Sequence, residues 1–155
     1  MIHDNSKTFF YPSSFYIRFL NKLMRHGKRE RIENIVFKVF LKIARYSKVP
    51  NFFIFFEILE KQKIYLSFRR DIKKKHVNLI PYSLSRFKQY WNSVSLLAKT
   101  IKLYERKVSI YEKILSCFSM YYDRNQRLFL WGISEKKRIY DVAITNRFLK
   151  HYRWR

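Results

Sequence analysis

The chain has 155 residues, the length of a single domain, and 48% of them are hydrophobic, which is enough to build a core. It carries 34 Lys and Arg against 11 Asp and Glu, a formal net charge of +23, and self-repulsion of that size destabilises a compact chain on its own. We therefore expect a polyanionic partner, either nucleic acid or an anionic membrane surface. No run of about 18 apolar residues occurs, so a transmembrane helix is excluded. The single cysteine excludes an internal disulfide and a multi-thiolate metal site.

The first predicted helix begins with Ser13 or Ser14 as its N-cap. Helical spacing assigns an apolar inner face and a basic outer face: Phe15, Phe19, Leu20 and Leu23 inward, and Arg18, Lys22 and Arg25 outward. Gly27 suits the end of this helix, because a residue without a Cβ can take the left-handed conformation. The segment His26–Arg29 is therefore expected to form an exposed basic corner.

A second helix follows, with apolar residues at steps of three and four: Ile32, Ile35, Val36, Val39, Phe40 and Ile43. Its opposite face is polar and basic: Arg31, Asn34, Lys38, Lys42 and Arg45. Pro50 predicts a break after this helix. A short third helix is then expected to bury aromatic and aliphatic side chains: Phe52, Phe55, Phe56 and Leu59.

The apolar periodicity changes to two residues from Ile64 to Phe68 and again from Val77 to Pro81, as in β-strands. A strongly basic insert, residues 69–76, separates the two stretches. We predict a two-stranded β-ribbon over about 64–81 that projects from the helical body and carries a basic tip.

Helical spacing returns after the ribbon. A long fourth helix from Ser83 would bury Leu84, Phe87, Trp91, Val94, Leu97, Ala98 and Ile101. A fifth would bury Val108, Tyr111, Ile114, Leu115 and Phe118, with Cys117 as a small buried hydrophobe. Residues 121–132 are expected to form a loop, and Ser134 to cap a sixth helix. That helix would direct Ile139, Val142 and Ala143 inward, and Lys136, Lys137, Arg138 and Arg147 outward.

The predicted fold class is thus mainly α, a bundle of about six helices with one protruding β-hairpin arm between the third and fourth. Residues 1–12 would be a flexible N-terminal arm, and residues 13–155 a single helical RNA-binding domain.

RNA is held by Lys and Arg on phosphates and by aromatic rings or guanidinium planes on unstacked bases. Residues 61–75 contain seven Lys or Arg and one Asp, and residues 150–155 alternate cations with rings. The candidate RNA-binding residues are Arg25, Lys28, Arg29, Arg69, Arg70, Lys73, Lys74, Lys75, Arg86, Lys136, Lys137, Arg138, Arg147, His151, Tyr152, Arg153, Trp154 and Arg155. A solvated helix face explains any single basic run equally well, but basic residues on every helix favour nucleic acid. Trp154 can pack over the helix ends or stack on a base, and both interpretations stay open.

Patterns for catalysis and metal binding are missing from the sequence. The four histidines are scattered, the two glycines cannot form a phosphate-binding loop, and the carboxylates lie mostly near a Lys or Arg with which they can pair. We therefore predict a protein that is not an enzyme, with no catalytic residues, no metal and no cofactor.

Two separated motifs point to a resemblance. The first consists of Phe19, Asn21, Leu23, Met24, Gly27 and Lys28, followed by Ile35, Val36 and Phe37. The second consists of Asn146 and His151-Tyr152-Arg153-Trp154. In this order they resemble the small-subunit ribosomal protein seven family (S-seven), whose arm also carries an Arg-Arg pair like Arg69 and Arg70. The family's hairpin turns on two adjacent glycines, which this chain lacks there.

The resemblance implies a structural protein that binds the 3′ major domain of small-subunit rRNA and organises the head of the subunit during assembly. It implies neighbours from ribosomal protein families nine, eleven and thirteen, and an arm near the exit-site tRNA and the mRNA path. Abundant Lys, Ile, Asn, Phe and Tyr suggest an A/T-rich organellar gene, and residues 1–7 show no Arg-rich presequence. We expect the mitochondrial matrix, in the mitochondrial ribosome, with a plastid ribosome as the second choice. The alternative is a basic aromatic organellar protein that binds a membrane surface or assists ribosome assembly.

Overall fold

The computed structural model describes residues 14–48, 50–73, 76–104, 107–122 and 131–154. The elements in chain order are α1 (Ser14–Leu23), α2 (Arg29–Ser47), α3 (Asn51–Gln62), β1 (Leu66–Lys73), β2 (His76–Ser83), α4 (Arg86–Leu103), α5 (Ile110–Tyr122), α6 (Trp131–Thr145) and the 3-10 segment η2 (Arg147–Trp154). This order confirms the predicted fold class, a mainly helical chain with one hairpin between the third and fourth helices.

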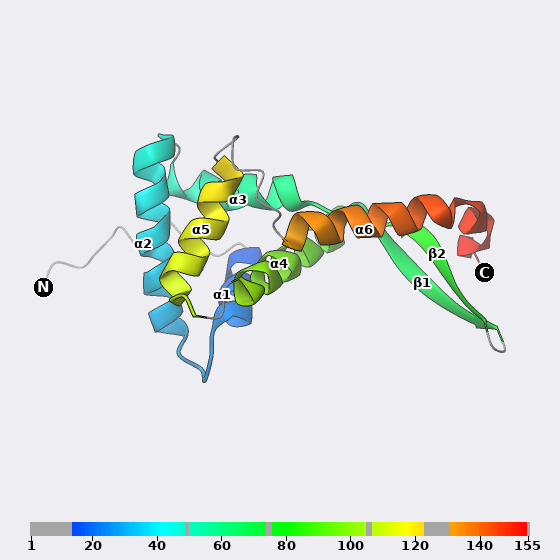
Figure 1. Ribbon diagram of the computed structural model, residues 1–155, viewed down its shortest axis with the longest axis horizontal. Helices are drawn as coiled ribbons and strands as arrows, with labels where there is room; N and C mark the ends of the chain where they lie inside the picture. Colours follow the sequence, from blue (N-terminus) through cyan, green and yellow to red (C-terminus); the bar gives the residue numbers. More distant parts are fainter. Residues whose placement is uncertain (1–13, 49, 74–75, 105–106, 123–130, 155) are drawn as a thin grey trace, which may run out of the picture.

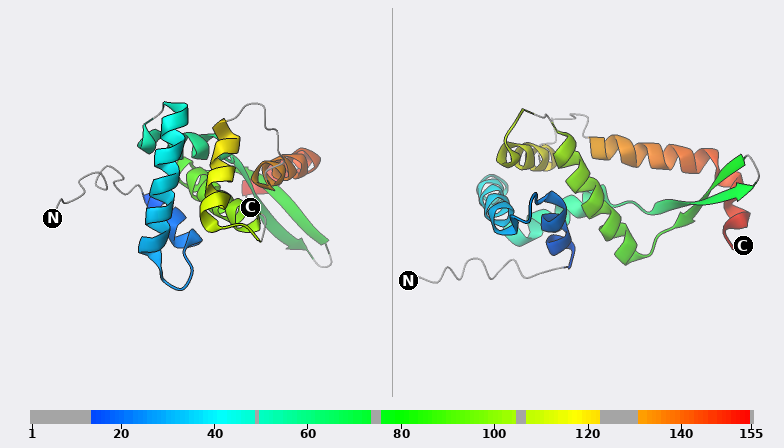
Figure 2. Two further views of the ribbon diagram at one scale, coloured as in Figure 1. Left: turned by 60° about the vertical axis from the view of Figure 1, so that its left-hand side comes forward. Right: turned by 90° about the horizontal axis from the view of Figure 1, so that it is seen from below.

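The molecule is elongated, with a helical body at one end and the hairpin at the other (Figure 1). Helices α1 to α5 pack together in the body, whereas α6 leaves it and runs beside the ribbon, as the view from below also shows (Figure 2). Helix α6 contacts β1, and η2 contacts β2. The arm therefore extends from the body as predicted, but the C-terminal part of the chain packs along it.

Four phenylalanines from four helices form the centre of the body. Phe40 of α2 stacks on Phe118 of α5, with ring centroids 5.3 Å apart and planes 14° apart. Phe55 of α3 lies 5.3 Å from Phe19 of α1 and 6.4 Å from Phe40. All four rings are at least 98% buried. The predicted inner faces of the first two helices are confirmed, with Leu23, Ile32, Val36, Val39 and Ile43 also in this core.

The turns between the first three helices use left-handed residues. His26 and Gly27 have φ of 53° and 71°, so the chain reverses between α1 and α2 where the glycine predicted it. Lys48 also has a positive φ, of 55°, and its N–H donates to the carbonyl of Ala44 at the end of α2. Pro50 then precedes the first residue of α3, so the predicted break is confirmed.

The hairpin is longer at its tip than the sequence pattern predicted. Its strands are antiparallel, in a register that runs from Leu66 opposite Ser83 to Lys73 opposite His76. Arg69 and Arg70 therefore lie within β1, opposite Ile80 and Leu79, and the expected basic insert is mostly paired strand. The backbone ladder continues through this polar stretch, with Ile72 opposite Val77 and Lys73 opposite His76.

Several predicted helix boundaries were wrong by a few residues. Helix α6 begins at Trp131, so Ser134, predicted as its N-cap, lies inside the helix. Serine is tolerated in a helix interior at modest cost, so its preference for N-cap positions did not determine where this helix begins. Helix α4 begins at Arg86, and Val108 precedes α5. Phe87 is 54% exposed, although its spacing predicted burial; it lies in the first turn of α4, where its ring contacts Phe15 and Trp91.

Ion pairs and hydrogen bonds concentrate where the arm joins the body. The Nζ of Lys63 lies 3.2 Å from a carboxylate oxygen of Glu60 and 3.2 Å from the hydroxyl of Tyr90, which itself donates to Glu60. The backbone N–H of Tyr65 donates to the hydroxyl of Tyr140 on α6 at 3.3 Å. These contacts tie together α3, α4, α6 and the start of the ribbon, a region called the joint below.

Candidate nucleic-acid interface

The predicted corner residues Arg25, Lys28 and Arg29 are all exposed and lie together at the turn between α1 and α2. His26 and Arg31 were predicted to face solvent but were not among the candidate RNA-binding residues, and both are exposed beside them. The tight left-handed turn at His26 and Gly27 holds these cations close together, so this corner presents concentrated positive charge to solvent.

A second basic region lies along the arm. Arg69 and Arg70 are exposed on β1, and Lys137, Arg138, Arg147 and His151 are exposed on α6 and η2, which run beside the hairpin. A shallow groove of about 350 Å³ lies between them, lined by Phe68, Arg70 and Leu79 of the hairpin and by Arg138, Ile139 and Val142 of α6, with Ser67. The fold thus unites two basic segments that lie far apart in the sequence.

The remaining predicted residues divide into two groups. Arg86 is exposed at the first turn of α4, between the two basic regions in the chain order. Lys74, Lys75 and Arg155 lie outside the described residues. The backbones of Lys73, Tyr152, Arg153 and Trp154 lie in β1 and η2, but their side chains lie outside the described part, so both interpretations of Trp154 stay open.

Lys136 was predicted to face outward, and it is less exposed than that prediction requires. It is half-buried, its ammonium group donates to the carbonyl of Lys61 at 3.1 Å, and burial lowers its pKa. This hydrogen bond links α6 to the end of α3 at the joint. Arg138 is exposed as predicted, but its guanidinium lies 2.5 and 2.9 Å from the carboxylate of Glu135, and these hydrogen bonds raise its pKa. An exposed ion pair of this kind opens at little cost when a phosphate competes for the guanidinium.

Arg18 was also predicted to face outward, and it does not. Its guanidinium lies 3.4 Å from the centre of the Trp91 ring and donates to Ser95 Oγ at 3.1 Å, while its Nε is buried without a hydrogen-bond partner. This desolvation lowers the pKa of Arg18. The residue fastens α1 to α4 through a cation–π contact and does not add to the RNA-facing charge.

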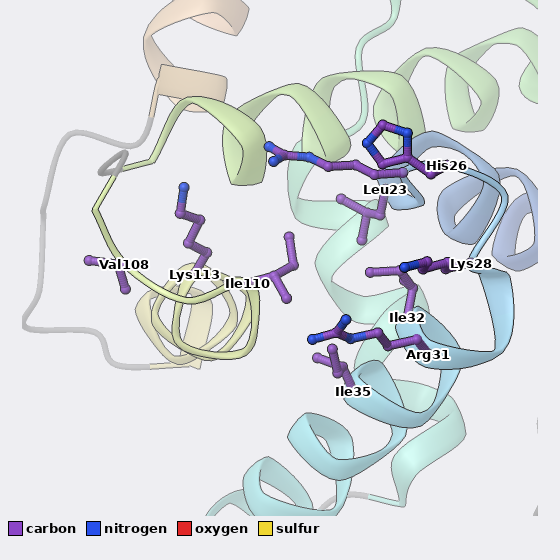
Figure 3. A pocket seen from close by; sticks show the side chains of 10 residues that line it. Leu23, His26, Lys28, Arg31, Ile32, Ile35, Val108, Ile110 and Lys113 are labelled. Carbon is purple, nitrogen blue, oxygen red and sulfur yellow. The ribbon is translucent and has the colours of Figure 1, made fainter.

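A pocket of about 430 Å³ lies beside the basic corner, between the α1–α2 turn and the start of α5; we call it the corner pocket. Its cationic lining consists of Arg25, His26, Lys28, Arg31 and Lys113. Its apolar lining consists of Leu23, Ile32, Ile35, Val108 and Ile110. Figure 3 shows Val108, Ile110 and Lys113 on one wall and the corner and α2 residues on the other, with Arg31 reaching from α2 toward α5. No carboxylate is found among these described lining residues.

Lys113 is the residue in this pocket that sequence reasoning missed. It was hidden in the apolar stretch of α5, next to Ile114, and it is only 7% exposed. Among the described residues, none forms an ion pair or side-chain hydrogen bond with its ammonium group. The detectable signal was a lysine on the apolar face of a helix, where its stem packs among hydrophobic side chains.

A shallower groove lies farther along α2. It is lined by Lys38, Leu41, Lys42, Arg45 and Tyr46 of α2 and by Tyr111 of α5, and Tyr46 is 81% exposed. Cations next to an exposed ring suit a nucleic acid, where phosphate and base face are bound by different side chains. The outer face of α2, predicted to be polar and basic, therefore continues the basic surface away from the corner.

Other kinds of site find no support in the described part of the chain. Across these residues, no helix has the length and apolar character required to cross a bilayer. No group of three or more His, Cys, Asp or Glu side chains comes together there in a way that could hold a metal ion.

Comparison with known proteins leaves the chain without an assigned family: no protein-family model matches it, and no curated protein matches it.

Proposed function

We propose that this protein is a structural RNA-binding component of the small ribosomal subunit, an organellar protein of the S-seven type. It binds the 3′ major domain of the small-subunit rRNA and organises the head during assembly. The arm lies near the exit-site tRNA and the mRNA path, and proteins of families nine, eleven and thirteen are its neighbours. It works in the mitochondrial matrix, without a cofactor and without catalysing a reaction.

The observation that carries the proposal is the placement of charge on this fold. A rigid aromatic core holds basic surfaces at both ends of an elongated body, the corner with Arg25, Lys28 and Arg29 and the arm with Arg70 and Arg147. Separated basic surfaces on one rigid body suit a partner that is itself folded and polyanionic, because each surface can hold a different segment. That is the requirement for organising a folded RNA.

The S-seven resemblance adds support at the level of architecture. The family has a hairpin arm that carries an Arg-Arg pair, and the hairpin between α3 and α4 carries Arg69 and Arg70 in β1. Its two motifs lie in the two basic regions, the first across the corner with Gly27 and Lys28 and the second in η2 beside the arm. Both motifs therefore belong to the regions where an RNA would be held.

Sedimentation of the native protein tests the proposal. Organelle lysate is separated on a sucrose gradient at moderate salt, and the protein is followed by antibody; co-migration with the small subunit is the expected result. Recovery with lipid vesicles instead would support the membrane-surface alternative, and recovery in precursor particles alone would support an assembly factor. Protein that stays at the top of the gradient, free of RNA and lipid, would refute the proposal.

A further inference from the structure

The corner pocket combines features that a purely solvated basic surface does not require. Five cationic or potentially cationic side chains share it with five apolar ones, and its volume of about 430 Å³ falls in the range of about 300–1,000 Å³ typical of small-ligand sites. Its described lining contains no carboxylate that could neutralise Arg25, Lys28, Arg31 and Lys113. A bound anion would supply that missing charge.

Lys113 gives the strongest indication of a ligand. The hydrocarbon stem of this lysine is packed against its neighbours, while its ammonium group keeps access to the pocket. Here Lys113 is 7% exposed, and among the described residues no acceptor or carboxylate partners its ammonium group. Figure 3 shows the side chain on the α5 wall, extending along the pocket. An anionic group placed in the pocket would satisfy it.

The apolar lining indicates what accompanies the anion. Ile32 and Ile35 of α2 and Ile110 of α5 provide hydrocarbon surface on both walls (Figure 3). Inorganic phosphate would leave this surface uncovered. A nucleotide has a phosphate for the cations and a flat base that can lie against apolar side chains, and single-stranded RNA offers such unstacked bases.

We infer that the corner pocket binds one nucleotide extruded from a single-stranded RNA segment, its phosphate on Lys113 and Arg31 and its base against the isoleucines. This inference rests on the proposed function for its partner, but it assigns a specific site and a new residue, Lys113. The backbone phosphates on either side of the extruded nucleotide then lie near Arg25 and Lys28.

Fluorescence anisotropy with a labelled seven-nucleotide uridine RNA tests this site. The first variant is Lys113→Met, which keeps the apolar stem of the side chain while removing its charge. Its matched control is Lys99→Met on α4, which removes the same charge from an exposed position outside the pocket. Loss of a hydrogen bond to a charged group predicts about tenfold weaker binding for Lys113→Met. Loss of one exposed cation predicts less than about threefold for the control.

The base is tested separately from the phosphate. An otherwise identical RNA with all bases removed should bind the wild-type protein about tenfold more weakly than the uridine RNA does. If Lys113→Met does not fold, as judged by its circular dichroism, Arg31→Gln replaces it, because Arg31 is exposed and its substitution should not disturb the core. Equal losses in the pocket variant and the control, or equal affinity for the two RNAs, would overturn the site.

The same titrations separate this site from the proposed function. A transcript of the rRNA 3′ major domain is measured in parallel. If the wild type binds that transcript while Lys113→Met behaves like its control on both RNAs, the pocket assignment is refuted and the proposed function stands. If the oligonucleotide shows the predicted losses but the transcript is not preferred over an unrelated RNA, the pocket stands and the proposed function fails. Binding to anionic phospholipid vesicles that is abolished in Lys113→Met, with oligonucleotide binding unchanged, would also refute the assignment.

Discussion

Replacing Phe40 with alanine should remove a large part of the stability of the helical body. Phe40 is fully buried, stacks on Phe118 at 5.3 Å and lies 6.4 Å from Phe55. Because none of the ring reaches solvent, the whole transfer term of about 1.5–3 kcal/mol is removed. The surrounding rings come from three other helices and cannot easily close the gap, so the cavity raises the total to about 3–5 kcal/mol. Against a usual stability of about 5–15 kcal/mol, this is a severe loss.

Urea unfolding followed by helical circular dichroism measures the effect at one fixed salt concentration. Phe148→Ala is the matched control, because the same ring is 66% exposed in η2 and its removal should change the free energy of unfolding by less than about 0.5 kcal/mol. In the double variant of Phe40 and Phe118, the loss should fall short of the sum by about 0.5–1.5 kcal/mol, the value of a stacked pair. Equal losses for Phe40→Ala and Phe148→Ala would refute the assignment of the core.

Three further outcomes follow from the structure. Changing Arg69 and Arg70 to glutamine should reduce the steepness of log affinity against log salt by about 0.7–0.9 for each phosphate that the variant no longer neutralises. The helical content should stay unchanged. An unaltered slope would mean that β1 does not contact RNA. The hydrogen bond from Tyr90 holds the pKa of Glu60 below its usual value. This pair therefore stabilises the fold above the unfolded pKa of Glu, and the stabilisation is lost as pH falls through the lowered folded pKa. Urea titrations at several pH values should show a smaller acid-induced loss of unfolding free energy in Tyr90→Phe than in the wild type. Burial raises the pKa of Cys117 to about 12. Because the thiolate is the reactive form, a thiol reagent at pH about 8 should modify this cysteine only after unfolding. Rapid labelling of the folded protein would contradict this expectation.

The helical body could be predicted closely because its pattern is redundant. In α2, every third or fourth residue is apolar, and Ile32, Val36, Val39, Phe40 and Ile43 are all buried. Gly27 predicted the turn between α1 and α2, because the left-handed conformation found there favours glycine. The hairpin boundaries were less clear, since alternation fades where charged residues enter the strand. The backbone ladder extends beyond the predicted alternating residues, to Ile72 opposite Val77 and Lys73 opposite His76.

The interface could be predicted only where charge lies on an exposed local element. Arg25, Lys28 and Arg70 met that condition, and they are exposed. Helical spacing alone does not indicate how deep a helix packs, so Arg18 and Lys136 were assigned outward although each bonds to another element. The corner pocket escaped prediction for a different reason. Lys113 and Lys28 lie far apart in the sequence but line the same pocket. The packing of α5 on α2 brings them together.

The few acidic residues help to explain why the ends of the molecule remain so basic. The described ion pairs join Glu57 to Lys61, Glu60 to Lys63 and Glu135 to Arg138, at the end of α3 and in the facing part of α6. These three acidic side chains thus pair with cations at or near the joint, whereas Glu30 and Glu33 lie at the start of α2 beside the corner and Asp71 lies in β1 on the arm. On both surfaces the cations outnumber these carboxylates, so arginine and lysine side chains remain for phosphate. The contacts of Lys63, Tyr90 and Lys136 at the joint connect the arm to the body, and the two surfaces keep a net positive charge, which is what a protein holding separate segments of one RNA requires.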